Sequence, residues 1–319
     1  MLRAILIYLS KAKWARRLVT GWRFARRAAA RFVAGDTLEE ALGAIRRLNA
    51  IGLSATLDHL GENVTNAEEA SRATDDYILL LDAIREPEFR ANASLKLTQL
   101  GLGLDYEMAL SNMRCIARQA ASFGTFVRID MEDSPTVDRA LHIYRALREE
   151  GFTNIGLVIQ SYLYRSREDT AKLVAEGTRL RLVKGAYKEL ADVAYPRKAD
   201  VDRCLDDLAR MAIDAALDHG AEPATSDGRV PPLTAIGSHD EKRIAYARKY
   251  AQMVGLPKSA LEFQMLYGIR PDLQRRLAEE GYPVRVYVPF GTEWYPYTVR
   301  RLAERPANVW FFLSNLFRR

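Results

Sequence analysis

The chain lacks the cysteines, histidine spacings and long apolar runs that characterise several classes of protein. Only two cysteines, Cys115 and Cys204, occur in 319 residues, which argues against a disulfide scaffold or a thiolate metal site and fits a reducing compartment. The four histidines show no HxxxH or HExxH spacing, so we expect no metal site. No run of 18 apolar residues occurs, and we therefore expect no transmembrane helix.

Acidic residues are absent from positions 1–35, which hold nine Lys and Arg. Because the whole chain carries +6 and this leader +9, the remaining 284 residues sum to −3. The basic character therefore belongs to the leader and does not indicate nucleic-acid binding by the body of the protein. We predict a basic amphipathic helical extension over residues 1–39, which either docks on the protein or lies on an anionic membrane surface. A mitochondrial presequence is a further alternative, whereas the short apolar run argues against a secretory signal.

From residue 54 onward, short β-like runs alternate with amphipathic helical stretches. There are eight such runs, at 54–60, 93–101, 125–133, 154–162, 179–187, 231–239, 261–268 and 284–291. Helical segments lie between them, for instance at 106–121, 136–150 and 200–218. Strands separated by helices pair in parallel through right-handed crossovers. The pattern predicts an α/β fold, a (β/α)8 TIM-type barrel over residues 40–319, with a doubly wound open sheet as the alternative.

Each run carries a polar or ionisable residue toward its C-terminal half. These residues are Asp58, Lys96, Asp130, Gln160, Lys184, His239, Gln264 and Tyr287. Any one of them is compatible with a solvated loop. Because barrel active sites lie where the C-terminal ends of the strands meet the loops, we expect the eight to surround one site.

A helix-like segment near the C-terminus, YTVRRLAERPAN (297–308), adds cations to this predicted site. Four of its residues fall at i, i+3, i+4 and i+7, on one helix face: Tyr297, Arg300, Arg301 and Glu304. Two guanidinium groups, together with the cations Lys96, Arg181 and Lys184, would give the barrel mouth an excess of positive charge, with Asp130 and Glu132 as the nearby acids. Such a site suits a carboxylate or a phosphate. The same helix face could also be a solvated stripe.

No phosphate-binding fingerprint extends this interpretation. GLGLDYE (101–107) begins with Gly-x-Gly but lacks the third glycine of a dinucleotide-binding motif, and no P-loop occurs. The residues alone therefore indicate a barrel enzyme that acts on a small anionic substrate.

Seven motifs on different predicted elements together resemble the proline dehydrogenase family. They are SLKLTQLG (94–101), RIDMED (128–133), VIQSY (158–162), RLVKGAY (181–187), EFQMLYGIR (262–270), VRVYVPFG (284–291) and WYPYTVRRLAERPAN (294–308). The resemblance is closest to the monofunctional bacterial members and covers roughly residues 40–319. The basic leader is not a signature of the family.

The resemblance implies a distorted (β/α)8 barrel that holds FAD at the C-terminal ends of the strands without a Rossmann fold. Members oxidise L-proline to 1-pyrroline-5-carboxylate and pass the electrons to a membrane quinone. Because the chain ends at Arg319, without an aldehyde dehydrogenase domain, we expect a separate pyrroline-5-carboxylate dehydrogenase to consume the product. We expect a cytoplasmic location, with peripheral contact at the inner face of the membrane if the leader binds lipid.

Carried over position by position, the resemblance implies three groups of site residues. The carboxylate of proline would be bound by Lys96, Arg300 and Arg301, with Glu304 orienting the arginines. The wall around the ring would be formed by Leu266, Tyr287 and Tyr297. The flavin contacts would be Met131, Gln160, Arg181, Lys184, Gly185, Ala186, Tyr187, Ser238 and His239. Arg181 would lie near flavin N5, and Asp130 would order Lys96 and the arginines rather than act as a base.

The chain departs from the family pattern at two positions. Lys188 stands where many relatives have Trp, and Ser238 where Thr is common. Three other interpretations stay open at this stage. These are a Schiff-base aldolase that uses Lys184, a peripheral membrane-binding module built on the leader, and an oxidase of hydroxyproline in place of proline.

Overall fold

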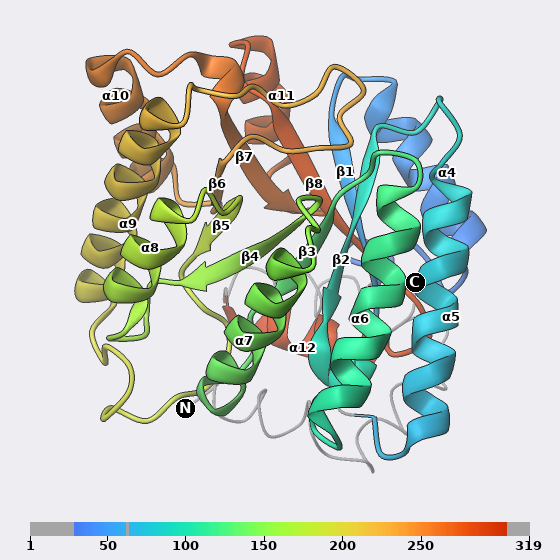
Figure 1. Ribbon diagram of the computed structural model, residues 1–319. Helices are drawn as coiled ribbons and strands as arrows, with labels where there is room; N and C mark the ends of the chain where they lie inside the picture. The colour runs from blue at the N-terminus through green and yellow to red at the C-terminus, as the bar shows by residue number, and fades with distance from the viewer. Residues whose placement is uncertain (1–28, 62–63, 305–319) are drawn as a thin grey trace, which may run out of the picture.

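The chain folds into a closed barrel of parallel strands surrounded by helices. The computed structural model describes residues 29–61 and 64–304, and for residues 300–304 it describes the backbone alone. The strands pair in chain order from β1 to β8, and β8 pairs with β1 in the same parallel sense (Figure 1). The prediction of a TIM-type barrel is therefore confirmed. The alternative of a doubly wound open sheet is wrong. Each edge strand of an open sheet has a neighbour on one side only, whereas every strand here has a neighbour on both sides.

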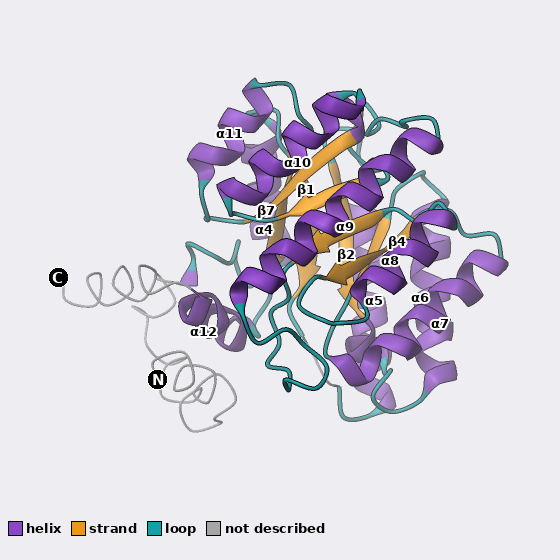
Figure 2. Ribbon diagram, turned by 90° about the vertical axis from the view of Figure 1, so that its left-hand side faces the viewer, coloured by secondary structure: helices purple, strands orange, loops and turns teal. Residues whose placement is uncertain are grey.

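All eight predicted runs overlap a strand, although the second strand begins at Ala91, two residues before its predicted run. The strands are β1 (Ser54–His59), β2 (Ala91–Lys96), β3 (Val127–Asp130), β4 (Ile155–Gln160), β5 (Leu180–Val183), β6 (Thr234–Gly237), β7 (Leu261–Leu266) and β8 (Val284–Phe290). The helices that cover them are α4 (Leu38–Asn49), α5 (Ala67–Ala83), α6 (Tyr106–Ala121), α7 (Val137–Glu149), α8 (Ser166–Ala175), α9 (Lys198–Asp218), α10 (Glu241–Val254) and α11 (Pro271–Glu279). The last described helix, α12 (Trp294–Glu304), lies apart from this ring, at one end of the barrel (Figure 2).

Local sequence signals explain where the helices begin. The side chain of Asp105 caps α6 by accepting a hydrogen bond from the backbone N–H of Met108 at 2.7 Å. Thr37 and Glu40 form a reciprocal capping box at the start of α4. The helix predicted at 106–121 coincides with α6, and its buried positions recur at helical spacing along one face. This helix therefore presents an apolar stripe to the barrel and a polar face to solvent.

Charged side chains occupy part of the barrel interior. Arg285 on β8 and Glu262 on β7 are each 1% exposed, and their side chains pair at 3.0 Å (Nε to Oε1) and 3.1 Å (Nη2 to Oε2). Arg285 also donates to the backbone carbonyls of Ala55 at 2.8 Å and Gly228 at 2.9 Å. Gly228 belongs to the loop between α9 and β6, so this pair ties the loop to the strands beneath the predicted site.

The segment that precedes α4 packs against α12 and the end of β8. It forms one buried cluster with α12, made of Ala29, Phe32, Val33, Leu60, Ile269, Trp294, Tyr295, Tyr297 and Val299. The N–H of Ala34 donates to the carbonyl of Pro289 and the N–H of Gly291 to that of Gly35, both at 2.9 Å. Gly268 has a φ of +70°, and a Cβ there would collide with the carbonyl of Arg31. A side chain at position 268 would therefore push this segment off the barrel.

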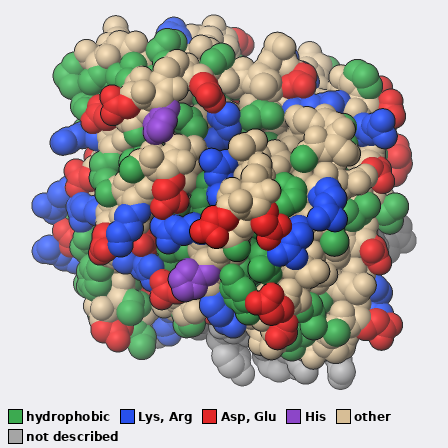
Figure 3. Space-filling model, in the orientation of Figure 1, with side chains coloured by type: hydrophobic (Ala, Val, Ile, Leu, Met, Phe, Trp, Pro, Cys, Tyr) green, Lys and Arg blue, Asp and Glu red, His purple; other side chains and the backbone are tan. Residues whose placement is uncertain are grey.

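Most of the predicted N-terminal extension, residues 1–28, lies outside the described residues, so the boundary at residue 39 and the role of the leader stay predictions. None of the helices in residues 29–61 and 64–304 combines the length and apolarity needed to span a membrane. The face drawn in Figure 3 intersperses basic and acidic side chains. Exposed pairs such as Arg145–Glu176, at 2.9 Å, contribute little to stability because solvent screens them.

Substitution of Arg285 by Met should destabilise the protein by about 3–5 kcal/mol, because Glu262 would be left as a buried, unpaired carboxylate. The double variant R285M/E262M should recover part of this loss, since it removes both charges. The free energy of unfolding in urea measures both effects. The matched control is Arg145→Met, which breaks an exposed pair and should cost less than about 1 kcal/mol. A loss for R285M as small as that of the control would contradict the role of the buried pair.

Candidate active site

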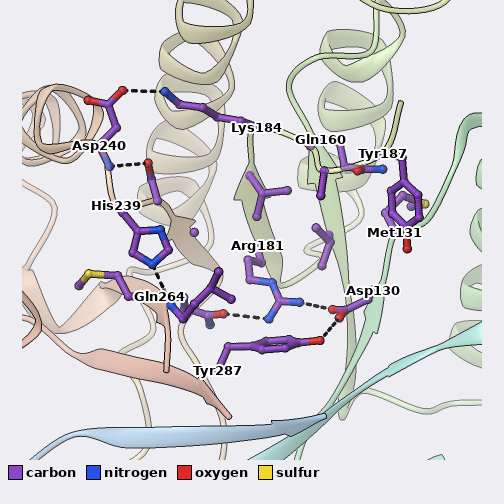
Figure 4. A pocket seen from close by; sticks show the side chains of 18 of the residues that line it. Asp130, Met131, Gln160, Arg181, Lys184, Tyr187, His239, Asp240, Gln264 and Tyr287 are labelled. Carbon is purple, nitrogen blue, oxygen red and sulfur yellow. Dashed lines mark hydrogen bonds and ion pairs between the residues drawn. The ribbon is translucent and has the colours of Figure 1, made fainter. Parts of the chain in front are cut away.

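A cavity of about 640 Å³ opens at the C-terminal ends of the strands, within the usual size range of small-molecule sites. It brings together most of the side chains that the sequence placed in the site: Lys96, Asp130, Met131, Gln160, Arg181, Lys184, Gly185, Ala186, Tyr187, Ser238, His239, Leu266, Tyr287 and Tyr297. Figure 4 shows that the residues it labels come from separate strands and loops and surround one space. Arg300, Arg301 and Glu304 belong to α12, but their side chains lie outside the described part of the chain.

Arg181 and Asp130 form the central ion pair at the base of the cavity (Figure 4). The guanidinium of Arg181 also donates to Ser94 Oγ and to Gln264 Oε1, each at 3.2 Å. Asp130 accepts hydrogen bonds from Ser94 Oγ at 2.6 Å and from the hydroxyl of Tyr287 at 2.8 Å. The carboxylate is therefore occupied as an acceptor on both oxygens. This arrangement suits a group that orients its neighbours.

The charge states of this cluster follow from burial and from its partners. Burial alone would raise the pKa of Asp130, but Arg181, Lys96 and the hydrogen bonds from Ser94 and Tyr287 together hold that pKa below its ordinary value. Burial, with the nearby carboxylates, raises the pKa of Tyr287 well above its ordinary value. Asp130 is therefore ionised at neutral pH, and Tyr287 remains a phenol that can donate.

Lys96 has a closer partner than Asp130. Its ammonium lies 3.1 and 3.2 Å from the two carboxylate oxygens of Asp58, 3.4 Å from the hydroxyl of Tyr287 and 3.8 Å from Asp130 Oδ2. Asp58 is completely buried, and burial raises its pKa despite the opposing effect of Lys96. The position of Asp58 toward the C-terminal half of its run had marked it as a strand-end residue, but it gave no indication of this pairing.

Lys184 is held between two carboxylates at the rim of the cavity. Its ammonium lies 2.5 Å from Asp202 and 2.6 Å from Asp240, and Lys198 also pairs with Asp202. Burial raises the pKa of both carboxyl groups, but the lysines more than compensate and hold both values below the ordinary one. Both carboxylates occupy the side-chain nitrogen of Lys184, and this pairing argues against the aldolase interpretation, which needs a lysine that is available to a substrate carbonyl.

Carboxylates pair with the described basic side chains at the barrel mouth. The expected excess of positive charge stays a prediction, because it depends on Arg300 and Arg301, whose side chains lie outside the described part of the chain. Among the described side chains that line or support the cavity, the basic ones face carboxylates. Lys96 faces Asp58, Arg181 faces Asp130, and Lys184 and Lys198 face Asp202 and Asp240. Asp202 lies in α9 and Asp240 directly before α10. Lys184 and Asp240 are 56 residues apart, so motif spacing could not reveal their pair, whereas Lys198 and Asp202 form an i,i+4 pair within α9.

The remaining predicted residues have well-defined hydrogen bonds. Gln160 donates its amide N–H to the carbonyl of Glu132 at 2.7 Å, which leaves its side-chain oxygen as the acceptor. The N–H of Leu266 donates to His239 Nε2 at 2.9 Å, so the ring is neutral and carries its proton on Nδ1. Ser238 Oγ accepts from the N–H of Asp240 at 3.1 Å.

Glu132, which was expected among the acids at the barrel mouth, instead binds Thr98. It is 5% exposed and accepts hydrogen bonds from Thr98 N at 3.0 Å and Thr98 Oγ1 at 2.5 Å. Conversely, Lys198, Asp240 and Arg270 line the cavity although the sequence assigned them no role. No cluster of metal-ligating side chains occurs in residues 29–61 and 64–304.

Comparison with known proteins decides the family. The model of the proline dehydrogenase family matches residues 41–313, and so covers most of the chain. The chain belongs to the proline dehydrogenase family. Membership accounts for the barrel and for the cavity at the strand ends.

Individual members of the proline dehydrogenase family match over most or all of the chain. Proline dehydrogenase 1 of Bacillus subtilis (strain 168) is 41% identical over 319 residues, 100% of both chains. Proline dehydrogenase of Deinococcus radiodurans is 40% identical over 294 residues, 91% of this chain and 90% of the relative. Among solved structures, proline utilization A (PutA) from Bdellovibrio bacteriovorus is 26% identical with a TM-score of 0.77. That match covers 88% of this chain but only 33% of the PutA chain.

In this proline dehydrogenase family member, Asp130→Asn should cost about 3–5 kcal/mol of unfolding free energy at pH 7, because Arg181 would lose its buried counter-charge. The penalty should shrink below about pH 4. A depressed carboxyl pKa stabilises the fold above the unfolded pKa, and this contribution is lost as the pH falls through the folded one. Urea unfolding at about pH 7 and about pH 3.5 measures both values. The control is the exposed Asp214→Asn. A penalty that is equal at both pH values would contradict the assignment.

Proposed function

We propose that this chain is an FAD-dependent dehydrogenase that oxidises L-proline to 1-pyrroline-5-carboxylate, the first step of proline catabolism to glutamate. Family membership supports the activity on proline. The proposal that the chain binds FAD and proline rests on one observation. A single cavity is lined by side chains from six strands, from the loops after them and from α12; the strands are β2, β3, β4, β5, β7 and β8. The electrons would pass to a membrane quinone, and a separate pyrroline-5-carboxylate dehydrogenase would take the product.

The lining of the cavity fits a flavin nucleotide. Met131, Val158 and Leu266 offer apolar surface to a flat ring, while Gln160 offers an acceptor oxygen to its edge. Lys184 and Lys198 supply cations of the kind that bind phosphate groups. The same residues, with Gly185, Ala186, Tyr187, Ser238 and His239, would hold FAD at the strand ends. When bound, FAD would supply the hydride acceptor.

A second part of the cavity fits a small ring that carries a carboxylate. Tyr287 and Tyr297 line the cavity with Leu266 and would form the wall around the pyrrolidine ring. Positions 300, 301 and 304 share the helical face of Tyr297 by their spacing, which supports Arg300 and Arg301 as carboxylate ligands and Glu304 as their orienter. Lys96 would complete this group. The hydroxyl of Tyr287 is fixed on Asp130 at 2.8 Å, so the ring cannot swing away, which favours proline over hydroxyproline.

The charged residues would position the substrate and stabilise the charge that develops. Binding the carboxylate would hold the carbon next to the ring nitrogen about 3–3.5 Å from the acceptor atom. Arg181 would lie beside the place where negative charge builds, in the orientation that Asp130, Ser94 and Gln264 impose on it. The ring amine must be neutral when hydride leaves, and a dedicated base is not required if solvent takes its proton.

Purified protein reconstituted with FAD should show a flavin absorption spectrum that bleaches when L-proline is added without oxygen. Bleaching is expected because electrons from proline would remain on the cofactor when no acceptor is present. An anaerobic titration in the visible range measures it, with D-proline as the control substrate. A protein that shows no flavin absorbance after reconstitution would refute the proposal.

Replacement of Arg301 by Met should raise the KM for proline about 10- to 100-fold while the flavin is retained, because a hydrogen bond to a charged group contributes about 1.5–3 kcal/mol. Steady-state kinetics with an artificial electron acceptor measure the KM, and the visible spectrum reports the flavin content. The matched control is Arg118→Met, on the exposed side of α6. An unchanged KM in R301M would exclude Arg301 as a carboxylate ligand.

A further inference from the structure

The guanidinium of Arg181 is held at both of its terminal nitrogens, by partners on different strands. Nη2 pairs with Asp130 on β3 and donates to Ser94 Oγ on β2 at 3.2 Å. Nη1 donates to Gln264 Oε1 on β7, also at 3.2 Å. A planar group that is bound at one end only can still rotate about that end, whereas bonds at two ends fix its plane. Gln264 therefore supplies the second of the two attachments that orient Arg181.

The side chain of Gln264 accepts from Arg181 only when its amide points in one direction. An arginine donates and does not accept, so the amide oxygen has to face Arg181. The amide nitrogen then faces Glu262, two residues earlier on the same strand, and donates to its Oε1 at 2.5 Å. A carboxylate accepts and does not donate, so Glu262 favours the same direction of the amide. A donor in place of this carboxylate oxygen would favour the opposite direction, with the amide nitrogen of Gln264 toward Arg181.

The strand between Arg181 and Gln264 leaves space for their contact. β6 lies between β5 and β7, and its residue Gly237 is the register partner of Gln264. A Cβ at Gly237 would lie 2.7 Å from Val183 Cγ1 and 3.3 Å from Arg181 Cγ, so a side chain there would crowd both. The absence of a side chain at position 237 therefore lets Arg181 cross to β7.

Glu262 itself does not reach the cavity. It is 1% exposed, and its two carboxylate oxygens also accept from Arg285 at 3.0 and 3.1 Å. Gln264 lines the cavity, whereas Glu262 does not. Any effect of Glu262 on the reaction must therefore pass through Gln264 or through the stability of the fold.

We propose that Glu262 is a positioning residue for the reaction: by fixing the amide of Gln264, it sets the direction of the guanidinium of Arg181 and thereby the rate of hydride transfer. The inference rests on the proposed function, which places Arg181 beside the atom that receives the hydride. A guanidinium whose direction is already fixed stabilises the charge that builds there without reorganising during the step. Glu262 acts from outside the cavity and touches neither substrate nor cofactor.

The first test compares rates of flavin bleaching when the FAD-reconstituted full-length protein is mixed with L-proline without oxygen. Glu262→Gln keeps the size of the side chain and an oxygen for Arg285, but it brings an amide donor next to Gln264. The limiting rate should fall about 10-fold, as for the loss of one hydrogen bond to a charged group. The proline concentration that gives half of this rate should change less than about 2-fold, because Glu262 does not bind the substrate. The matched control, Glu149→Gln on the exposed side of α7, should leave both values unchanged.

A double-mutant cycle tests whether Glu262 acts through Gln264. Gln264→Met removes the amide and should by itself slow the bleaching by a similar factor. E262Q/Q264M should then be no slower than Q264M, because the route from Glu262 to Arg181 has already been removed. Effects that multiply in the double variant would mean that Glu262 acts on the fold by another route, and they would overturn the inference.

A crystal structure of Glu262→Gln prepared without FAD gives a readout that does not depend on activity. The distance from Arg181 Nη1 to the side-chain oxygen of Gln264 is 3.2 Å in wild type. In the variant it should exceed about 3.5 Å, beyond which no hydrogen bond remains. If Glu262→Gln does not fold, R285M/E262M takes its place in these measurements, since it removes the acceptor of Gln264 and leaves no buried charge unpaired.

A retained contact at 3.2 Å, or an unchanged rate of bleaching in the folded variant, would overturn the inference. Proline would still bleach the flavin of wild type in both cases, so the proposed function would stand. If proline does not bleach wild type, the proposed function fails and this inference fails with it.

Discussion

The ion pair between Arg181 and Asp130 is the constraint on which the rest of the site depends. It joins β5 to β3 across the barrel, and Ser94, Gln264 and Tyr287 are all arranged around it. Because Asp130 accepts hydrogen bonds on both of its carboxylate oxygens, Arg181 has one favoured orientation and Tyr287 one favoured rotamer. The wall of the cavity and its central cation are therefore fixed by the same carboxylate.

Further hydrogen bonds connect Arg181 to the opposite end of the barrel. Gln264 accepts from Arg181 with its side-chain oxygen and donates its amide N–H to Glu262 at 2.5 Å, so its two ends cannot be exchanged without loss of both bonds. Glu262 in turn binds Arg285, which holds the loop that contains Gly228. An unbroken chain of polar contacts thus runs from the cavity to the opposite end of the barrel. The residues that stabilise the fold and those that orient Arg181 belong to one network.

The sequence alone supported the barrel and most of the cavity lining, because both follow from regular patterns. Eight runs with a polar residue near the end of each are enough to place Lys96, Gln160 and Tyr287 at one mouth. The pairing of charges was not accessible in this way. Whether Lys96 meets Asp58 or Asp130 depends on side-chain direction and on the stagger between strands, which no spacing along the chain encodes. The excess of positive charge expected from Arg300 and Arg301 stays a prediction, since their side chains lie outside the described part of the chain.

The packing of residues 29–35 against β8 and α12 has a consequence for how the protein is made. Ala34 and Gly35 bond to Pro289 and Gly291, about 250 residues later in the chain, and β1 pairs with β8 along its whole length. A ribosome releases the early segment long before its partners exist. The barrel therefore stays open, with the backbone N–H and C=O groups along one edge of β1 unpaired, until nearly the whole chain has been synthesised. A nascent chain of this protein would need a chaperone most between the emergence of β1 and that of β8.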